Sequence, residues 1–478
     1  MAHPQFEAVN LISDPIHGYI ELTKRLTPDQ AARAGLPDED AAEEDLLDSR
    51  WMQRLRRISQ LQAARWVFPT AEHSRFGHAL GVMHEAGLWG RSLYPTLREV
   101  LEEDAAEGGD AAAHPIPSEA LVVETLRIAG LLHDVGHGPF SHFFDEHVLC
   151  AWPAPPHPSR DSGKRLTHED LSQAIVEREL APTVSALRRA PLEWGRAGFA
   201  PGESIDPRWV GVLVSKPPIT DGAMPLWVRR LQPLFSGIFT VDNLDYVRRD
   251  AYMTGVATGP VDAERLRSYA FMSDRGLALY EPGLGALEMF LTTRLYMYNT
   301  VYFHRTVRAI DLDLAEAFSP AIEAIFGDRN PLDALDAYAA LDEYALLYHA
   351  ARWARGEALA DRPIPGDGRV SPAVAARWRE ILLRRPGWHA VREARRDSRT
   401  GTARESVEAE LLSALGTEPG RFRLDLSDAD ARPQNPLHVD GRLIVGRRDG
   451  TLDVKPLSEL LERLPAVVTV GRVYERTG

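Results

Sequence analysis

Histidine and aspartate side chains are dense in segment 128–145, where an apolar run ends in the adjacent pair His133 and Asp134. A Gly-His-Gly-Pro break follows the pair, and the segment then supplies further titratable residues: His137, His142 and Asp145. Imidazole and carboxylate groups are the commonest nitrogen and oxygen ligands of divalent metals, and they are also the usual acids and bases of hydrolysis. Because so many such groups would make a poor hydrophobic core, the segment is predicted to be an active site.

Side chains from separate segments form a predicted metal site: His78, His133, Asp134 and Asp242. Nitrogen and oxygen donors of this kind suit Mn, Fe, Co, Ni, Zn or Mg and leave positions for water or phosphate. Such an ion would polarise a phosphoryl group and lower the pKa of bound water. Taken singly, each residue has a structural explanation, since a lone histidine is commonly a satisfied polar group and Asp242 fits an ordinary helix. The adjacent His-Asp pair at the end of an apolar helix is the more specific signal.

The elements that must position these residues are predicted to be mainly helices. Apolar spacing indicates helices over 46–66, 75–94, 121–133, 231–252, 287–318, 332–354 and 372–383, with a further helix that begins after Thr167. A helical bundle brings distant ligands together in its core. Alternating residues predict short strands at 14–22 and 271–280, and a change of pattern from residue 421 predicts a small α+β lobe. The predicted fold class is mainly α, with a catalytic core at 1–330, a helical extension at 331–410 and the lobe at 411–478.

Composition limits the environment and the partners. The chain of 478 residues is 44% hydrophobic and 26% charged, which is ordinary for a globular protein. No apolar run reaches the roughly 18 residues of a membrane span, so no membrane contact is expected. The single cysteine, Cys150, excludes an intramolecular disulfide framework and favours a cytoplasmic location. The net charge of −14 argues against broad capture of nucleic acid but not against a small polyphosphate.

The order Arg75-Phe76-Gly77-His78, His133-Asp134 and Asp242 resembles the H…HD…D signature of the HD-domain phosphohydrolases. The closer similarity is to the deoxynucleoside triphosphate (dNTP) triphosphohydrolases of that superfamily, the type that in animals carries an added sterile-alpha-motif domain, which is not expected here. The resemblance rests on these blocks: Asp14-Pro15-Ile16-His17-Gly18, Phe68-Pro69, residues 73–81, His133–Asp145, Asp242–Asp250 and, more loosely, Asn435–His438 and Arg472–Tyr474. It covers most of the chain and implies an HD-domain helical bundle.

This resemblance implies water attack on the α-phosphorus of a dNTP, which releases deoxynucleoside and triphosphate. It assigns acid and base roles to His142 and His168, the orientation of a histidine to Asp145, and a phosphate contact to His137. A histidine with a near-neutral pKa can protonate a departing 5′-oxygen, and a neighbouring carboxylate would fix its tautomer. The residue pattern alone leaves His137 and His142 open between catalysis and a supporting structural role.

Substrate contacts also follow from the resemblance. The positions that match phosphate, sugar and base contacts of the family are Arg75, Gln60, Leu61, Tyr246, Asp250, Arg294 and Tyr302. Gln60 and Leu61 match positions that read the deoxyribose, where a close wall would exclude a 2′-hydroxyl. One position departs from the pattern, because Asn243 stands where the family often has a lysine beside the metal aspartate. A surface or bundle salt bridge is the structural alternative for Arg75.

A second nucleotide site is implied by Asp48, Gln53 and Arg56, which match an allosteric guanine-binding pocket of some family members. A GTP or dGTP activator and a homo-oligomer, with a tetramer favoured, would follow. Spacing alone describes these residues as a solvated helix face. The lysine-valine pair of that pocket corresponds here to Asn10 and Leu11, which is a second departure.

Two other functions stay open at the level of sequence. An HD-type nucleotidase or phosphodiesterase would use the same metal site on another nucleotide, and a 5′-nucleotidase would release orthophosphate. A nucleotide-binding regulator with an inactive site would bind without turnover. The complete ligand set argues against an inactive site, so a metal-dependent hydrolase of dNTPs is the favoured prediction.

Overall fold

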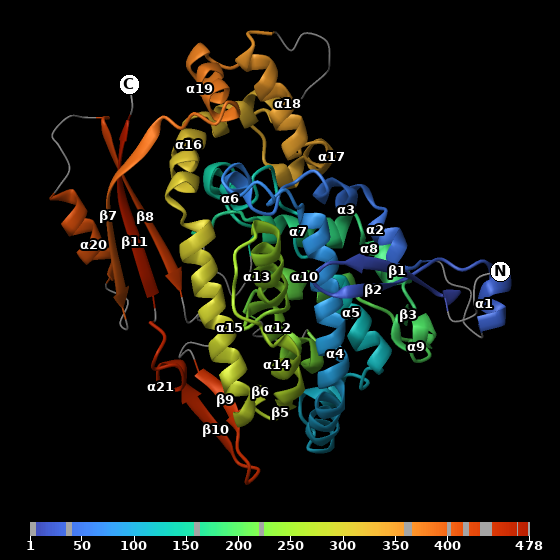
Figure 1. The fold of residues 1–478 in the computed structure, drawn as a ribbon. Coiled ribbons are helices and arrows are strands. Elements are labelled where there is room, and N and C mark those ends of the chain that lie inside the picture. The colour runs from blue at the N-terminus through green and yellow to red at the C-terminus, as the bar shows by residue number, and fades with distance from the viewer. Residues whose placement is uncertain are drawn as a thin grey trace.

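The computed structural model describes residues 6–34, 41–156, 163–218, 224–357, 366–398, 403–413, 420–430, 442–465 and 467–476. Helices dominate these residues, and short strands lie around the helical body (Figure 1). The prediction of a mainly helical fold with small sheets in the C-terminal region is confirmed. The block Asn435–His438, to which the family resemblance was extended, lies outside the described residues.

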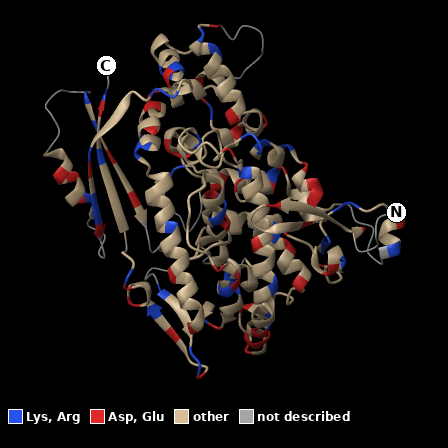
Figure 2. Cartoon of the chain, in the orientation of Figure 1, with Lys and Arg blue, Asp and Glu red and all other residues tan. Residues whose placement is uncertain are grey.

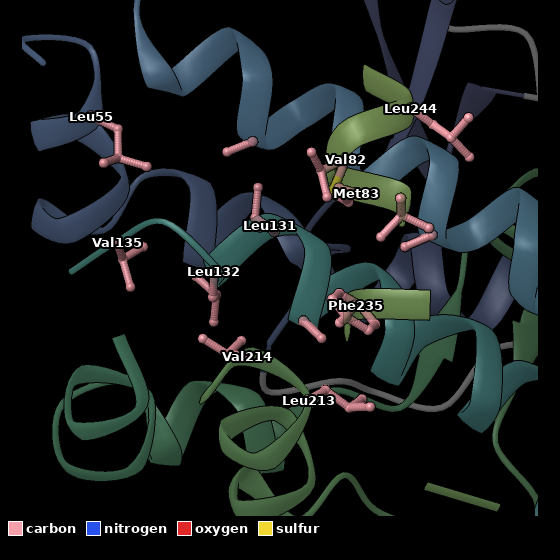
Figure 3. Packing of buried hydrophobic residues seen from close by; sticks show 14 of the residues in the cluster. Leu55, Val82, Met83, Leu131, Leu132, Val135, Leu213, Val214, Phe235 and Leu244 are labelled. Atoms are coloured by element: carbon pink, nitrogen blue, oxygen red, sulfur yellow. The ribbon is translucent and has the colours of Figure 1, made fainter. Parts of the chain in front are cut away.

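The centre of the helical body is the pair α4 (Arg75–Ala106) and α5 (Glu119–Leu132). Every residue of α5 from Ala120 to Leu132 is buried, as expected for a helix that is apolar on all sides. Figure 3 shows Val82 and Met83 of α4 beside Leu131 of α5 in one apolar cluster. Helices α10 (Pro207–Ser215) and α13 (Val241–Thr254) pack into the same cluster. This buried apolar packing holds the C-terminal end of α5 and helix α13 beside the first turns of α4.

The remaining helices surround this centre. They are α1 (Pro28–Ala34), α2 (Glu43–Leu47), α3 (Arg50–Leu55), α6 (His142–His147), α7 (His168–Arg178), α8 (Ala181–Ala186), α9 (Leu192–Gly195), α11 (Leu226–Leu231), α12 (Pro233–Ser236), α14 (Ala263–Tyr269), α15 (Leu284–Met297), α16 (Arg305–Phe326), α17 (Leu335–Ala339), α18 (Glu343–Ala354), α19 (Pro372–Leu382), α20 (Ala403–Leu412) and α21 (Leu457–Leu460). Thr167 caps the start of α7 together with Asp170, as the sequence predicts.

The strands form small sheets around the helices. β1 (Val9–Asp14) and β2 (Gly18–Thr23) make the expected N-terminal hairpin. β5 (Ala270–Ser273) and β6 (Gly276–Tyr280) are joined by the C-terminal strands β9 (Arg442–Gly446) and β10 (Leu452–Pro456) in the order β10-β9-β6-β5. The third sheet has the antiparallel order β7-β11-β8, from β7 (Trp388–Ser398), β11 (Val467–Arg476) and β8 (Phe422–Asp430). β3 (Arg189–Ala190) and β4 (Ala197–Gly198) form a short pair.

The C-terminal strands are distributed between two sheets rather than one. β9 pairs in parallel with β6 of the predicted core, while α20 packs its Val407 and Leu411 against the sheet that contains β7. The predicted boundary at residue 410 therefore lies inside α20. The division into three parts stays a prediction.

Four predicted helices are wrong because the chain breaks them. Segment 287–318 is divided into α15, a π-helical turn and α16, and segment 332–354 is divided into α17 and α18. Segment 46–66 forms α2, α3 and a short 3₁₀ turn, since Ser49 caps α3 and the chain after Leu55 turns to meet α4. Backbone bonds fix this turn: the Gln60 amide donates to the His73 carbonyl and the Arg75 amide to the Ile58 carbonyl, both at 3.0 Å. Segment 231–252 is likewise divided into α12 and α13, with Pro233 starting α12 and Gly237 ending it.

None of the described helices is both long and apolar enough to cross a membrane. Lys and Arg are interspersed with Asp and Glu along most of the described elements (Figure 2). Much of this charge is locally paired, as between Arg377 of α19 and the carboxylates of Asp313 and Glu316 on α16.

Gly130 allows α4 and α5 to approach closely just before the His133-Asp134 pair. A Cβ at residue 130 would lie 2.8 Å from the Val82 carbonyl oxygen and 3.0 Å from the Met83 Cα, both of which are backbone atoms. We expect Gly130→Ala to push the helices apart, to destabilise the fold by about 1–3 kcal/mol and to weaken metal binding. Thermal unfolding and metal titration of the purified variant measure both effects.

The matched control is Gly285→Ala, because Gly285 is exposed on α15 and a Cβ there would meet nothing within 4 Å. This variant should keep or slightly raise stability, since alanine favours a helix over glycine. Equal stability and equal metal affinity in both variants would contradict the role given to the close approach.

Candidate active site

Three helices position the predicted metal ligands. His78 lies near the start of α4, His133 and Asp134 directly follow α5, and Asp242 lies in the first turn of α13. A capping box fixes that first turn, because the Asn243 amide donates to the Thr240 hydroxyl and the Thr240 amide donates to Asn243 Oδ1. A second anchor holds the turn after α5, where the Ser172 hydroxyl donates to the His133 carbonyl and accepts from the Gly136 amide.

These side chains converge on a small space. His78 Nε2 lies 3.1 Å from Asp242 Oδ1, and His133 Nε2 lies 3.2 Å from Asp134 Oδ1. His133 Nε2 is 3.9 Å from the same Asp242 oxygen, and the rings of His78 and His133 meet edge to face with centroids 5.1 Å apart. The structure thus brings together all of the predicted ligands, although His78 and His133 are 55 residues apart in the chain and Asp134 and Asp242 are 108 apart.

The donor set fits a divalent metal. One ligand atom each from His78, His133 and Asp134 lies within 4.8 Å of the others, and all three residues are buried. His133 Nδ1 donates to the Gly130 carbonyl at 2.8 Å, while its buried Nε2 has no hydrogen-bond partner and faces the carboxylates. An imidazole nitrogen that is buried, unprotonated and unpartnered is the form that binds a metal. When bound, such an ion would supply Lewis-acid polarisation of a phosphoryl group and a bound water of lowered pKa.

Arg75 forms an ion pair with Asp134, one of the predicted metal ligands. Its guanidinium donates to Asp134 Oδ2 and to the Ser141 hydroxyl, and all of these groups are buried. Burial alone would raise the pKa of the Asp134 carboxyl, but Arg75 and the neighbouring histidines hold it well below its usual range. Asp134 therefore stays an anion, with its Oδ1 directed toward His133.

Asp245 contacts the predicted metal ligand His78 at Nδ1, the ring nitrogen that does not face Asp242. Its Oδ2 accepts from His78 Nδ1 at 2.8 Å, and its Oδ1 lies 2.7 Å from His17 Nε2 in the turn that joins β1 to β2. Arg249 donates to both Asp245 oxygens and also to Asp14, which caps the turn that carries His17. Burial opposes protonation of His78, yet Asp242 and Asp245 raise its pKa to about 10 in the absence of metal. A carboxylate on Nδ1 fixes the ring so that Nε2 faces the metal site.

Replacing this support tests its role. We expect Asp245→Asn to weaken metal affinity by roughly 10- to 100-fold, because the amide no longer fixes the tautomer and orientation of His78. The measurement is metal titration by calorimetry.

Asp313→Asn is the matched control, since Asp313 is an equally buried carboxylate that pairs with Arg377 far from these histidines. It should lose stability and keep its metal affinity. If both variants bind metal like the wild type, Asp245 is only a structural residue.

A second cluster adjoins the first and contains His137, His142, Asp145 and His168. His168 Nδ1 lies 2.5 Å from Asp145 Oδ2, and the His137 ring stacks on His168 at 3.6 Å with 13° between the planes. Imidazoles bind metals in the ring plane, and two stacked rings do not converge on one ion. The geometry of this cluster therefore favours proton transfer over a second metal.

In the second cluster, the pKa values of His168 and His137 are shifted in opposite directions. Burial lowers the pKa of His168, but Asp145 outweighs burial and raises it above its ordinary value, whereas Asp145 itself stays ionised. Burial and the Arg75 guanidinium lower the pKa of His137 well below its usual range, so this ring is neutral. The His142 side chain is far more exposed than those of His137 and His168, with 60% of it accessible to solvent. Its Nδ1 lies 3.5 Å from Asp145 Oδ2.

Both clusters border a cavity of about 730 Å³. The predicted substrate residues that line it are Gln60, Leu61, Arg75, Tyr246, Asp250, Arg294 and Tyr302, together with His133, Asp134, His142, His168 and Asp242. Tyr302 donates to Asp250 at 2.7 Å, and Arg294 donates to the Tyr246 hydroxyl at 3.1 Å. Tyrosine rings and the Gln60-Leu61 turn thus border the same cavity as the predicted ligands His133, Asp134 and Asp242. His78, His137 and Asp145 are not among the residues that line it.

The predicted activator residues lie apart from this cavity on α2 and α3. Asp48 ends α2 and is exposed, and the Gln53 amide donates to the Leu47 carbonyl at 2.8 Å. Arg56 donates to Gln53 and its guanidinium lies 3.6 Å from the centre of the Phe76 ring. They do not share one helix with Gln60, contrary to the expectation, because the chain breaks after Leu55.

Some residues around the site were not predicted from sequence. Asp245 follows Asp242 by one helical turn, so its spacing could have indicated a shared face. His17 lies in a block used only for the resemblance, and its partner is distant in the chain. Lys216 and Glu169 also line the cavity, and no local pattern marks Lys216.

Comparison with known proteins agrees with this geometry. Residues 75–203 match the HD domain, and residues 261–355 match the HD associated region. The HD-domain match covers part of the chain. It includes the predicted ligands His78, His133 and Asp134, while Asp242 lies between the two matched regions. HD domains are metal-dependent, which agrees with the donor set described above; which metal binds stays a prediction.

Relatives of this chain include the uncharacterized protein YwfO of Bacillus subtilis, 26% identical over 74% of this chain and 69% of its own length. A deoxynucleoside triphosphate triphosphohydrolase SAMHD1 homolog of Dictyostelium discoideum is 27% identical over 65% of this chain. The chain spans about half of that relative, with 49% of its length covered.

Two solved structures share the fold of this chain. A hypothetical protein from Aquifex aeolicus has a TM-score of 0.63 and 23% identity and covers 98% of this chain and 96% of its own. A phosphohydrolase from Bacteroides thetaiotaomicron has a TM-score of 0.60 and 19% identity, with 98% and 100% covered. The chain therefore shares the overall fold of these two structures.

Proposed function

We propose that this protein hydrolyses dNTPs to deoxynucleoside and triphosphate. The observation that carries the proposal is the composition of the cavity, whose wall combines predicted metal ligands, His142 and His168, three tyrosines and the Gln60-Leu61 turn. A volume of about 730 Å³ is within the range of small-molecule sites and suits a nucleotide. The resemblance to dNTP triphosphohydrolases supports the same reaction.

The chemistry follows from the chain's own groups. Water adds to the α-phosphorus, the bond from phosphorus to the 5′-oxygen breaks, and the departing oxygen takes a proton. His168 is the proposed donor, because Asp145 holds its ring and raises its pKa so that it carries a proton near neutral pH. His142, exposed toward the cavity, is the proposed second acid or base, and neutral His137 packs against the face of His168.

We assign substrate selection to the part of the cavity wall formed by the Gln60-Leu61 turn. Gln60 is nearly buried and its backbone is held by the His73 carbonyl, so this turn is a fixed surface. Its proposed role is to contact the deoxyribose and exclude a 2′-hydroxyl. His73 and Tyr302 both bond to Asp250, at 2.9 and 2.7 Å, which links the Gln60 turn to the proposed sugar and base contacts.

The direct test is product identification. Purified protein is incubated with each dNTP and Mn²⁺ or Mg²⁺, with and without GTP, and the phosphorus products are resolved by ³¹P NMR. We expect triphosphate in the ³¹P spectrum and an equal amount of deoxynucleoside, which carries no phosphorus and is measured by chromatography. Orthophosphate would indicate a nucleotidase instead, and binding without any product would indicate a regulator.

The proton donor is tested by the pH profile of Asp145→Asn. Asp145 raises the pKa of His168, and a raised pKa keeps the acid form present until the pH exceeds it. Removing the carboxylate lowers that pKa, so the alkaline limb of kcat should move to lower pH and kcat should fall, by roughly two to four orders of magnitude if His168 is also misoriented.

Glu146→Gln is the control for this profile, because Glu146 is a carboxylate of the same short helix that also lines the cavity. Its alkaline limb should match the wild type. An unchanged limb in Asp145→Asn would remove His168 from the role of general acid.

A guanine-nucleotide activator and a tetramer belong to the proposal on the strength of the resemblance. Asp48, Gln53 and Arg56 are the proposed contacts, and Arg56 stacks on Phe76, two residues before the metal ligand His78. This packing offers a physical route from an activator to the metal site through the start of α4. Arg56→Ala should reduce stimulation by GTP without changing the basal rate, and undiminished stimulation would contradict the assignment.

A further inference from the structure

Lys216 is a cation on the cavity wall to which neither the sequence prediction nor the proposed chemistry gives a role. It follows the last residue of α10 with φ 53° and ψ 39°, the left-handed conformation usually taken by glycine at this position. For a lysine this conformation costs about 1 kcal/mol. An unusual backbone conformation beside an active site is a reason to look for what the side chain does there.

The ammonium of Lys216 faces the catalytic groups. It donates to Glu169 Oε1 at 2.8 Å, and Glu169 is the neighbour of His168 in the first turn of α7. Lys216 and Glu169 have 25% and 26% of their side chains exposed, and both line the cavity, so a ligand can reach this ion pair. Burial alone would lower the pKa of Lys216, but Glu169 and, further off, Asp242 raise it, so the amine is charged.

Two other residues of the cavity wall that could contact a phosphate, Arg75 and Asn243, are already engaged or uncharged. The Arg75 guanidinium is divided between Asp134 and Ser141. Asn243, next to the metal ligand Asp242, carries no charge and uses its Oδ1 to close the cap of α13. A polyphosphate in this cavity would need mobile cationic donors in addition to a metal, and a lysine on a flexible stem can leave a carboxylate for a phosphate oxygen.

We propose that Lys216 binds the polyphosphate of the ligand and that Glu169 holds its ammonium until a phosphate oxygen takes the place of the carboxylate. The inference rests on the proposed function for the identity of the substrate. Its physical content, a lysine that exchanges one oxyanion for another, applies to any polyphosphate that enters the cavity.

The test measures binding of inorganic triphosphate to the metal-loaded protein by calorimetry, which requires no turnover. Lys216→Met should raise the Kd by roughly 10- to 100-fold, the loss expected for a charge-assisted hydrogen bond. Lys216→Arg should stay close to the wild type because it keeps the charge. Lys455→Met is the control: Lys455 also pairs with a glutamate and is 26% exposed, but it lies on β10 and is not among the cavity residues.

Glu169→Gln separates the two possible roles of the pair. If Glu169 competes with phosphate for the ammonium, its amide should bind triphosphate more tightly, by about threefold or more. Equal Kd values for wild type and Lys216→Met, or weaker binding by Glu169→Gln, would overturn the proposal and leave an ion pair that only joins α10 to α7.

A second set of measurements tests whether the polyphosphate that Lys216 binds is that of a dNTP substrate. If dNTPs are substrates, Lys216→Met should raise KM for dNTPs in proportion to the Kd for triphosphate. Should the wild type release orthophosphate from nucleotides while the Kd effect persists, the proposed function fails and the role of Lys216 in phosphate binding stands.

Discussion

Buried carboxylates inside a mainly apolar bundle are the constraint on which the site depends. Asp134 and Asp245 are almost fully buried, and a carboxylate in such surroundings must be paired or hydrogen-bonded. Arg75 supplies the partner of Asp134, and Arg249 together with His17 and His78 supplies those of Asp245. Each pairing also fixes a ligand, because Asp134 directs one oxygen at His133 and Asp245 turns His78 toward Asp242. The contacts that compensate the buried charges therefore also position the predicted metal ligands.

The arrangement assigns different tasks to neighbouring histidines through their surroundings. His133 has one nitrogen on a backbone carbonyl and the other unpartnered, which suits a metal ligand. His168 has an ionised carboxylate on its ring and a raised pKa, which suits a proton donor. His137 lies between Arg75 and His168 and is held neutral. Three imidazoles within one short region thus differ in protonation because the charges beside them differ.

The sequence predicted the uninterrupted helices α4 and α5 and candidate site residues that the structure brings together beside them. The roles of those residues stay predictions. An apolar run that ends in His133-Asp134 indicates both a buried helix and its function, and α5 ends there. The same reasoning failed between residues 46 and 66, where apolar spacing is helical but the chain breaks. The break depends on tertiary bonds, such as those from the Ser59 amide and hydroxyl to Glu343, which periodicity cannot register. Lys216 was missed for a similar reason, since its importance comes from Glu169 and the cavity and not from its neighbours in the chain.

The measurement that tests the metal centre most directly is anomalous scattering from crystals grown with Mn²⁺. The geometry predicts a peak within about 2.0–2.3 Å of His78 Nε2, His133 Nε2 and carboxylate oxygens of Asp134 and Asp242. Such a peak would establish that the buried carboxylates and histidines form a metal site. A peak among His137, His142, Asp145 and His168 instead, with none at the predicted position, would contradict the account and turn the proposed proton donor into a ligand.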